Sequence, residues 1–177
     1  MKTWLLTVAV PLGLAAGPPH AQPPKPAPNV LRRPGETTVF SFKTSRGKTV
    51  SLCEGPKGAY LVYRYGTAAK TELQYPAVLD ASSWQKFTYF GYHRSAIPVS
   101  NYYRLSFSNS GTKYELYDRE EEVIDEEGNE EYPREVGITV DVPKGSNAVF
   151  EGEVSSVYGG LMLTEKQQQR VKIEGDE

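Results

Sequence analysis

Cys53 and His93 are the two side chains from which this chain could build a nucleophile. The chain has one cysteine and two histidines, and the other histidine, His20, lies near the amino end. A thiol becomes nucleophilic near neutral pH when an imidazole or another cation lowers its pKa. Cys53 lies in a run of strand-forming residues, where a packed, unreactive thiol is the usual outcome. We therefore expect a buried Cys53 and no Cys–His dyad.

The sequence has few residues that could bind a metal ion or a cofactor. Zinc sites use three or four His, Cys or carboxylate ligands, and the chain has too few His and Cys for a recognisable spacing. No Gly-x-Ser-x-Gly elbow, phosphate-binding loop or dinucleotide fingerprint occurs. We expect no catalytic residues, no metal, no cofactor and no enzymatic activity.

Carboxylates are concentrated between Asp118 and Glu135. This segment has ten acidic residues against two arginines, a net charge of −8. Gly128 and Asn129 are typical of a turn, which predicts a long acidic hairpin. The candidate contact residues on it are Glu120, Glu121, Glu122, Asp125, Glu126 and Glu127.

Three interpretations of the acidic hairpin stay open. Its charge could keep a long strand pair from aggregating. It could bind a protein with a basic surface, because such a patch raises the association rate and sharpens partner choice. Calcium is the third, although Val123 stands where an EF-hand loop with its glycine at 128 would have its first ligand.

A second candidate contact region combines aromatic and basic side chains. All twelve tyrosines lie between Tyr60 and Tyr158, and many adjoin Arg or Lys, as in the run Tyr92, His93, Arg94. Tyr is a favoured strand residue whose hydroxyl can stay in water, so packing explains many of these rings. Tyr and Arg are also favoured interface anchors, and rings can stack on sugars. A protein or a cell-wall glycan is therefore the alternative to packing alone.

The beginning of the chain has the layout of a secretory signal peptide. Lys2 precedes an apolar run from Trp4 to Ala16, and small residues follow. The run is too short to span a bilayer about 30 Å thick. We predict a signal peptide at residues 1–21, a Pro-rich spacer at 22–34 and an extracytoplasmic location, in the bacterial periplasm or secreted.

Composition limits the partners of the rest of the chain. Without residues 1–21 it has 19 basic and 22 acidic side chains, a formal charge of −3. This charge is not that of a nucleic-acid-binding protein, which is typically basic. No later apolar run approaches the length of a membrane span. Residues 35–174 suffice for one domain that buries about two thirds of its unfolded surface.

Short alternating runs predict the fold of this domain. The clearest are 102–108 and 113–117, joined by Asn109-Ser110-Gly111, and 136–142, where every second residue is Val or Ile. Residues 161–173 are compatible with strand or helix. Eight or nine strands without a well-capped helix indicate one all-β domain, an antiparallel sandwich or barrel. The other expected strands are 37–44, 48–54, 59–65, 71–75, 84–94 and 148–154.

The stretch from Val50 to Pro76 lies at the centre of this pattern. With its neighbours it resembles a family of small secreted bacterial proteins that have no assigned activity, over roughly residues 38–117. The resemblance implies an exported, β-rich protein and no chemistry. Its members often have a cysteine where this chain has Phe42, so any disulfide there cannot form. The residues that carry the resemblance are Phe40-x-Phe42, Gly47-Lys48, Leu52-Cys53, Tyr63-x-Tyr65-Gly66 and Glu72-Leu73-x-Tyr75-Pro76.

These observations favour a non-enzymatic binding protein. Its expected partner is a protein with a basic surface, in an inhibitor or immunity-type role. A cell-wall glycan-binding module and a structural envelope protein are the alternatives. Aromatic rings that line a groove would favour the first alternative, and self-association would favour the second.

Overall fold

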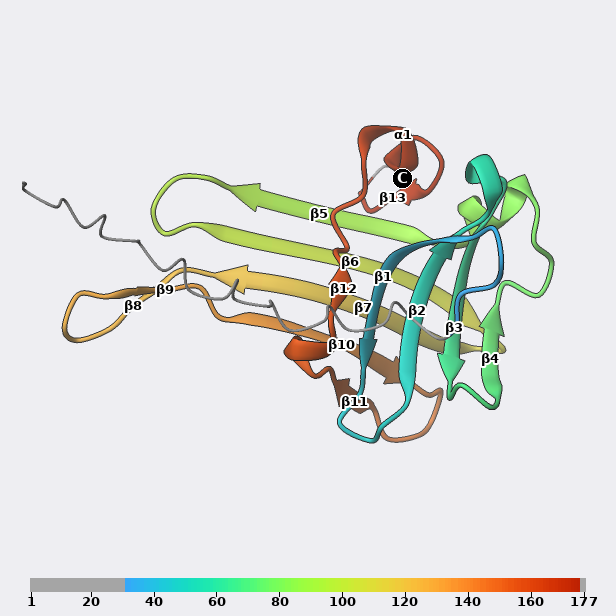
Figure 1. Ribbon diagram of the computed structural model, residues 1–177, viewed down its shortest axis with the longest axis horizontal. Helices are drawn as coiled ribbons and strands as arrows, with labels where there is room; N and C mark the ends of the chain where they lie inside the picture. The colour runs from blue at the N-terminus through green and yellow to red at the C-terminus, as the bar shows by residue number, and fades with distance from the viewer. Residues whose placement is uncertain (1–30, 176–177) are drawn as a thin grey trace, which may run out of the picture.

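Strands make up about half of residues 31–175, the part of the chain that the structure, a computed structural model, describes. The predicted signal peptide and most of the predicted spacer lie outside these residues. Two large sheets pack face to face, and the strands of one run across those of the other (Figure 1). The expected all-β class is confirmed, with a sandwich-like arrangement of mainly antiparallel sheets.

The two sheets differ in strand number and strand length. The first has the order β12 (Tyr158–Gly159), β1 (Thr37–Lys43), β2 (Thr49–Glu54), β3 (Leu61–Gly66) and β4 (Thr71–Tyr75). The second has the order β11 (Ala148–Glu151), β10 (Arg134–Asp141), β7 (Thr112–Glu121), β6 (Ser100–Asn109), β5 (Thr88–Arg94) and β13 (Lys172–Ile173). A small ribbon pairs β8 (Val123–Ile124) with β9 (Glu130–Glu131).

The described residues thus contain thirteen strands, and the expected eight or nine was too low. Four of the thirteen, β8, β9, β12 and β13, have two residues each. A two-residue strand has no alternation that a sequence pattern could show, and only pairing with its neighbour defines it. The longer strands lie close to their predicted positions.

The core between the sheets is built by alternation along the strands. Phe40, Leu52 and Tyr63 point into it from the five-stranded sheet, and each is at most 1% exposed. Leu105 and Leu116 meet them from β6 and β7. Successive strand residues point to opposite faces, so each strand gives every second side chain to this core.

Strand length explains why part of the six-stranded sheet is not covered. β6 and β7 have ten residues each, a rise of about 33 Å at roughly 3.3 Å per residue. The five strands that cross them, about 4.8 Å apart, span only about 20 Å. The ends of the long strands must therefore extend past the smaller sheet, as Figure 1 shows at its left.

The predicted turn between β6 and β7 is confirmed. Ser110 and Gly111 form a two-residue connection, and their φ values are 51° and 81°. Turns of this length need positive φ so that their twist matches the twist of the strands. This tight turn fixes the register in which Leu105 lies opposite Leu116.

Residues 84–86 were wrongly expected to begin a strand. They belong to a 3-10 helix, Ala81–Lys86, and β5 starts only at Thr88. The Asp80 side chain caps this helix by accepting a hydrogen bond from the Ser82 amide at 2.8 Å. Trp84 is 1% exposed, and its indole N–H donates to the Gly58 carbonyl at 3.1 Å. The Asp80 cap and the hydrogen bond from Trp84 to Gly58 outweigh the strand preference of the aromatic residues that follow.

The ambiguous segment 161–173 contains both kinds of structure. Residues Glu165–Gln168 form the short helix α1, whose capping box joins Thr164 and Gln167. β13 follows and pairs in parallel with β5. No helix within residues 31–175 is long and apolar enough to cross a membrane.

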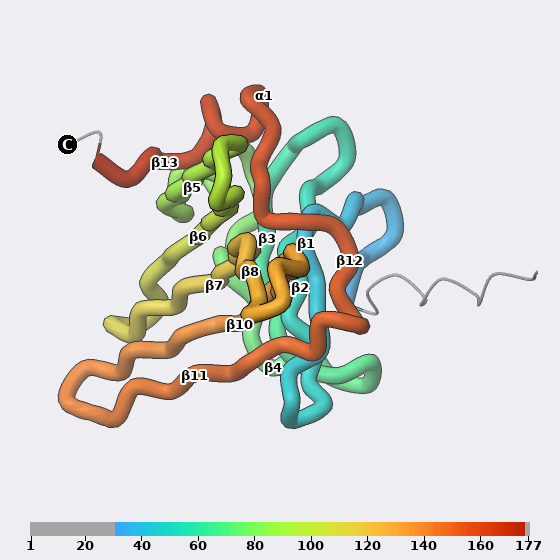
Figure 2. The backbone as a smooth tube through the Cα atoms, turned by 90° about the vertical axis from the view of Figure 1, so that its left-hand side faces the viewer, coloured from blue at the N-terminus to red at the C-terminus, as the bar shows by residue number. Residues whose placement is uncertain are grey.

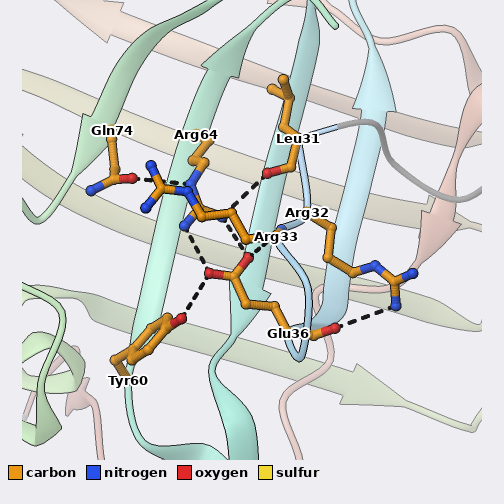
Figure 3. Close-up of polar contacts among 7 residues, drawn as sticks. All are labelled: Leu31, Arg32, Arg33, Glu36, Tyr60, Arg64 and Gln74. Carbon is orange, nitrogen blue, oxygen red and sulfur yellow. Dashed lines mark hydrogen bonds and ion pairs between the residues drawn. The ribbon is translucent and has the colours of Figure 1, made fainter.

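A buried ion pair holds the segment that leads into β1. Arg64 on β3 donates to both carboxylate oxygens of Glu36, at 2.6 and 2.8 Å, and neither side chain is more than 1% exposed. Arg64 also donates to the Leu31 carbonyl at 3.2 Å, and the Tyr60 hydroxyl donates to Glu36 at 2.9 Å (Figure 3). Gln74 binds the remaining guanidinium edge at 3.1 Å. Residues 31–36 are therefore attached to the outer face of the five-stranded sheet.

We predict that Glu36→Gln lowers the free energy of unfolding by about 3–5 kcal/mol, because Arg64 is left as a buried, uncompensated charge. The matched control is Glu174→Gln, which breaks the exposed pair with Arg104 (2.7 Å) and should cost less than about 1 kcal/mol. Urea unfolding followed by fluorescence measures both variants. Equal losses would contradict the role given to the buried pair.

Glu36 also makes stability depend on pH. Burial by itself raises the pKa of Glu36, but hydrogen bonds from Arg64, the Arg33 amide and Tyr60 hold it below its ordinary value of 4.5. The native protein therefore binds this proton more weakly than the unfolded chain does. The contribution is complete above about pH 4.5 and is lost as the pH falls further. We predict a smaller loss of stability in this acid range for Glu36→Gln than for the wild type, measured by urea unfolding at several pH values.

Candidate functional site

The candidate contact residues from the sequence all lie on two neighbouring hairpins that extend past the smaller sheet. We call residues 91–103 and 118–135 the projecting hairpins; the first joins β5 to β6 and the second joins β7 to β10. β6 and β7 pair along their whole length, so the two hairpins form one continuous surface. Figure 2 looks toward their ends, with β8 in front.

The negative charge is neutralised at the base of the second hairpin. Arg134 makes a two-pronged ion pair with Asp118, with N···O distances of 2.8 and 2.9 Å. Arg119 binds Glu135 through its Nε at 2.9 Å on the other side of the sheet. Both arginines of the segment thus form ion pairs at the base of the hairpin. The excess negative charge lies farther out, on residues 120–131.

The Asp118–Arg134 pair also joins the two sheets. Asp118 is 6% exposed and accepts a hydrogen bond from the Leu161 amide at 2.9 Å. Arg134 donates to the carbonyl of Gly159 at 3.2 Å. Gly159 lies in β12, which pairs with β1 of the five-stranded sheet. The projecting hairpins are therefore fastened to the body of the domain at their base.

The outer end of the second hairpin is a tight turn with exposed carboxylates. The Asp125 carboxylate accepts hydrogen bonds from the Asn129 amide at 2.7 Å and the Asn129 side chain at 2.8 Å. These bonds lower the pKa of Asp125 below its ordinary value. Glu126 and Glu127 are exposed on the same turn. Asp125 thus shapes the turn, and Glu126 and Glu127 are available to a partner.

Large apolar side chains are exposed among these charges. Ile124 is 54% exposed and Tyr132 46% exposed on the second hairpin, and Ile97 is 74% exposed at the end of the first. Protein interfaces typically combine apolar contacts with a polar rim. The ends of both hairpins therefore present the two components that a protein contact needs.

The inner face of the hairpins, on the side of the smaller sheet, has a cleft of about 270 Å³ whose lining combines polar and apolar side chains. His93 hydrogen-bonds to Asn101, and Asn101 donates to Glu120 at 3.5 Å. Met162 and Tyr103 complete its wall. The polar groups of the cleft thus bind one another. One row of direct cross-strand partners runs under it: His93, Asn101, Glu120 and Arg134.

Tyr92 and Arg94 lie on the opposite, outer face, because adjacent strand residues point to opposite sides. Tyr92 is 45% exposed, beside Tyr102 and Arg119 in one cross-strand row. Arg94 donates to the Pro98 carbonyl at 2.8 Å and so stabilises the loop of the first hairpin. The predicted run Tyr92, His93, Arg94 is thus divided between two surfaces.

Glu122 lies inside the structure, contrary to its expected role as a contact residue on a solvated hairpin. It is 6% exposed, and its carboxylate accepts a hydrogen bond from the Val99 amide at 2.6 Å. The Glu122 amide donates to the Val99 carbonyl at 2.9 Å. Glu122 therefore joins the two projecting hairpins, and its neighbour Glu121 remains exposed.

Cys53 and His93 are far from forming a pair. Cys53 is fully buried on β2, on the face opposite Leu52 and hence away from the six-stranded sheet. His93 is exposed on the six-stranded sheet. Burial raises the pKa of the Cys53 thiol to about 11. Within residues 31–175, no cluster of three or more His, Cys, Asp or Glu side chains could hold a metal ion.

Sequence reasoning missed the residues that organise this surface. It counted Asp118 and Arg134 only as charges, and it did not select Asn101, Ile97 or Ile124. The adjacent apolar pair Val123-Ile124 within an acidic segment was the one available signal for a contact surface. Pairing across strands is not visible in the sequence.

Comparisons with known proteins found no match for this chain among protein-family models, curated proteins or solved structures. The resemblance to small secreted bacterial proteins therefore stays a prediction. The functional argument depends on the surfaces described above.

We predict different roles for two adjacent glutamates. Glu122→Ala should destabilise the projecting hairpins by about 1–3 kcal/mol, because the Val99 amide loses a charged partner. Glu121→Ala, at an exposed position, should change stability by less than about 0.5 kcal/mol. Hydrogen exchange of residues 96–100 distinguishes them, and equal protection in both variants would contradict the joining role of Glu122.

We also predict that Cys53 is unreactive in the native protein. A thiol-specific reagent at pH 8 should label it only at the rate of unfolding, because the side chain is buried and its pKa is about 11. Labelling should be complete within minutes in denaturant. Fast labelling under native conditions would contradict the burial.

Proposed function

We propose that this protein is a non-enzymatic binding protein that acts outside the cytoplasm and binds a protein with a basic surface. The projecting hairpins are its binding surface, in an inhibitor or immunity-type role. The observation that carries the proposal is the composition of their ends: unpaired carboxylates beside exposed apolar side chains on a rigidly fastened base.

Electrostatics supports a basic partner. Segment 118–135 carries a net charge of −8, and its two arginines are bound at the base by Asp118 and Glu135. The exposed carboxylates farther out lie at the end of a projecting element, where the rest of the protein does not screen them. Such a charged patch attracts a partner of opposite charge and raises the association rate.

Apolar exposure distinguishes a binding surface from a device for solubility. Carboxylates alone would protect a strand pair from aggregation. Ile97, Ile124 and Tyr132 work against solubility, since each leaves a large apolar side chain in water. A partner that covers them would gain about 25 cal/mol for each Å² of apolar surface buried.

The extracytoplasmic location is supported by the amino-terminal sequence, with its charged start, apolar run and Pro-rich continuation in residues 1–34. A single cysteine that is buried suits an oxidising compartment, because it offers no exposed thiol for unwanted disulfides. A cell-wall glycan or a second copy of the chain are the alternative partners, and the experiment below separates them.

We predict that Glu126→Gln, Glu127→Gln and Glu131→Gln together abolish salt-sensitive binding of the partner. The wild type and the triple variant serve as baits for an envelope extract, with washes at low and high salt and analysis of bound protein and glycan. The wild type should retain a stoichiometric protein at low salt, and the variant should not. The reason is the loss of three of the exposed carboxylates that steer association.

The matched control changes the same charge elsewhere: Glu151→Gln, Glu153→Gln and Glu165→Gln, all exposed and outside the hairpins. This control should bind like the wild type. Equal retention by all three baits would contradict the proposed surface. Retention of glycan or of the chain itself in place of a protein would favour one of the alternatives.

A further inference from the structure

A second cleft, of about 380 Å³, opens between the two sheets at the end of the sandwich opposite the projecting hairpins. Its lining includes four aromatic rings. They belong to Tyr63 and Tyr65 from β3, Tyr114 from β7 and Phe150 from β11. Leu73, Ile138 and Val140 add aliphatic surface. A cleft of this size with a largely apolar, aromatic lining is typical of a small-molecule site.

The rings of the cleft continue the aromatic core. Tyr114 stacks on the core residue Phe107, with ring centroids 4.9 Å apart and planes 7° apart. Tyr63 contacts the same Phe107 ring at 4.9 Å. Tyr65 and Phe150 approach each other across the two sheets at 6.5 Å. The inner wall is thus fixed by packing before any ligand enters.

Tyr63 is the most buried of the three tyrosines that line the cleft, and its hydroxyl is one of their polar groups. The Tyr63 side chain is 1% exposed and lines the cleft, and no residue among 31–175 hydrogen-bonds to its hydroxyl. Burial raises the pKa of Tyr63 far above its ordinary value, and Tyr114 and Tyr65 raise it further, so the hydroxyl keeps its proton. This hydroxyl is open to the cleft, where water or a ligand can hydrogen-bond to it.

We propose that this cleft binds a small uncharged aromatic molecule with one hydrogen-bonding group, such as a phenol or an indole. Its ring packs against Tyr65, Tyr114 and Phe150, and its polar group hydrogen-bonds to the Tyr63 hydroxyl. Offset and edge-to-face contacts between rings add to the burial of apolar surface. The ligand thus supplies apolar surface that packs against the rings and one polar group that hydrogen-bonds to the Tyr63 hydroxyl.

Other ligand classes fit the lining less well. A saccharide carries many hydroxyls that need hydrogen-bond partners, but Glu72, the charged residue of the lining, is already bound to Lys48. An organic cation would compete with Arg46, whose guanidinium lies 4.9 Å from the Phe150 ring centroid. With Glu72 bound to Lys48, the cleft has no free negative charge to offer a cation.

This site is independent of the proposed protein contact. It is formed by the opposite ends of β7 and β10, far along the strands from residues 118–135. A ligand could bind here whether or not the projecting hairpins bind a protein. The two proposals therefore fail separately.

Calorimetric titration of the purified protein with phenol and with indole tests the site. We expect saturable binding with one molecule per chain. Tyr63→Phe keeps the ring and removes the hydroxyl, and it should weaken binding about three- to tenfold. Phe150→Leu keeps apolar volume and removes a ring, and it should weaken binding about two- to tenfold. Tyr92→Phe, which removes an exposed hydroxyl on another surface, should leave the affinity unchanged.

Three results would overturn the proposal. They are no saturable binding of phenol or indole, equal affinity of Tyr63→Phe and Tyr92→Phe, and tighter binding of methyl glucoside or tetramethylammonium than of either aromatic probe. Urea unfolding of each variant verifies that it is folded before titration. Because the Tyr63 hydroxyl has no hydrogen-bond partner in the described residues, and Tyr63→Phe keeps the ring contact with Phe107, this variant should be at least as stable as the wild type.

Discussion

The crossing of a long-stranded sheet over a narrower one is the constraint on which the rest of this structure depends. Ten-residue strands cannot be covered by five strands that run across them, so part of each long strand must meet solvent on both faces. At one end this produces the projecting hairpins, fastened where Asp118 and Arg134 reach back to β12 and its neighbouring residues. At the other end the sheets separate over a ring-lined cleft. Both candidate binding surfaces are consequences of this geometry.

Burial separates the carboxylates that have a fixed partner from those that do not. Carboxylates that lie within the structure have a fixed partner: Glu36 has Arg64, Asp118 has Arg134 and Glu122 has the Val99 amide. Glu126, Glu127 and Glu131, which are exposed farther out on the second hairpin, have no such partner among residues 31–175. A buried charge must be paired to be tolerated, whereas an exposed one costs little and can act at a distance. This difference separates the residues that hold the hairpins from those available to a partner.

The sequence predicted the all-β class, the longer strands and the acidic hairpin, because alternation and turn residues are local signals. It did not predict that residues 84–86 form a 3-10 helix, since the decisive contact of Trp84 is with Gly58, far away in the chain. It could not separate Glu122 from Glu121, because their difference is made by Val99 on the neighbouring hairpin. The division of Tyr92 and His93 between two faces follows from alternation, but the cleft beneath His93 needs the register of four strands.

Site-specific photo-crosslinking in cells that express the protein tests the central claim most directly. A photoreactive amino acid replaces Ile124 at the end of the second hairpin, or Val149, which is 58% exposed on the edge strand β11. The account predicts one discrete crosslinked protein from position 124 and none from position 149. Crosslinks of equal strength from both positions, or none from position 124 while the protein is folded, would contradict the claim that the projecting hairpins bind a partner protein.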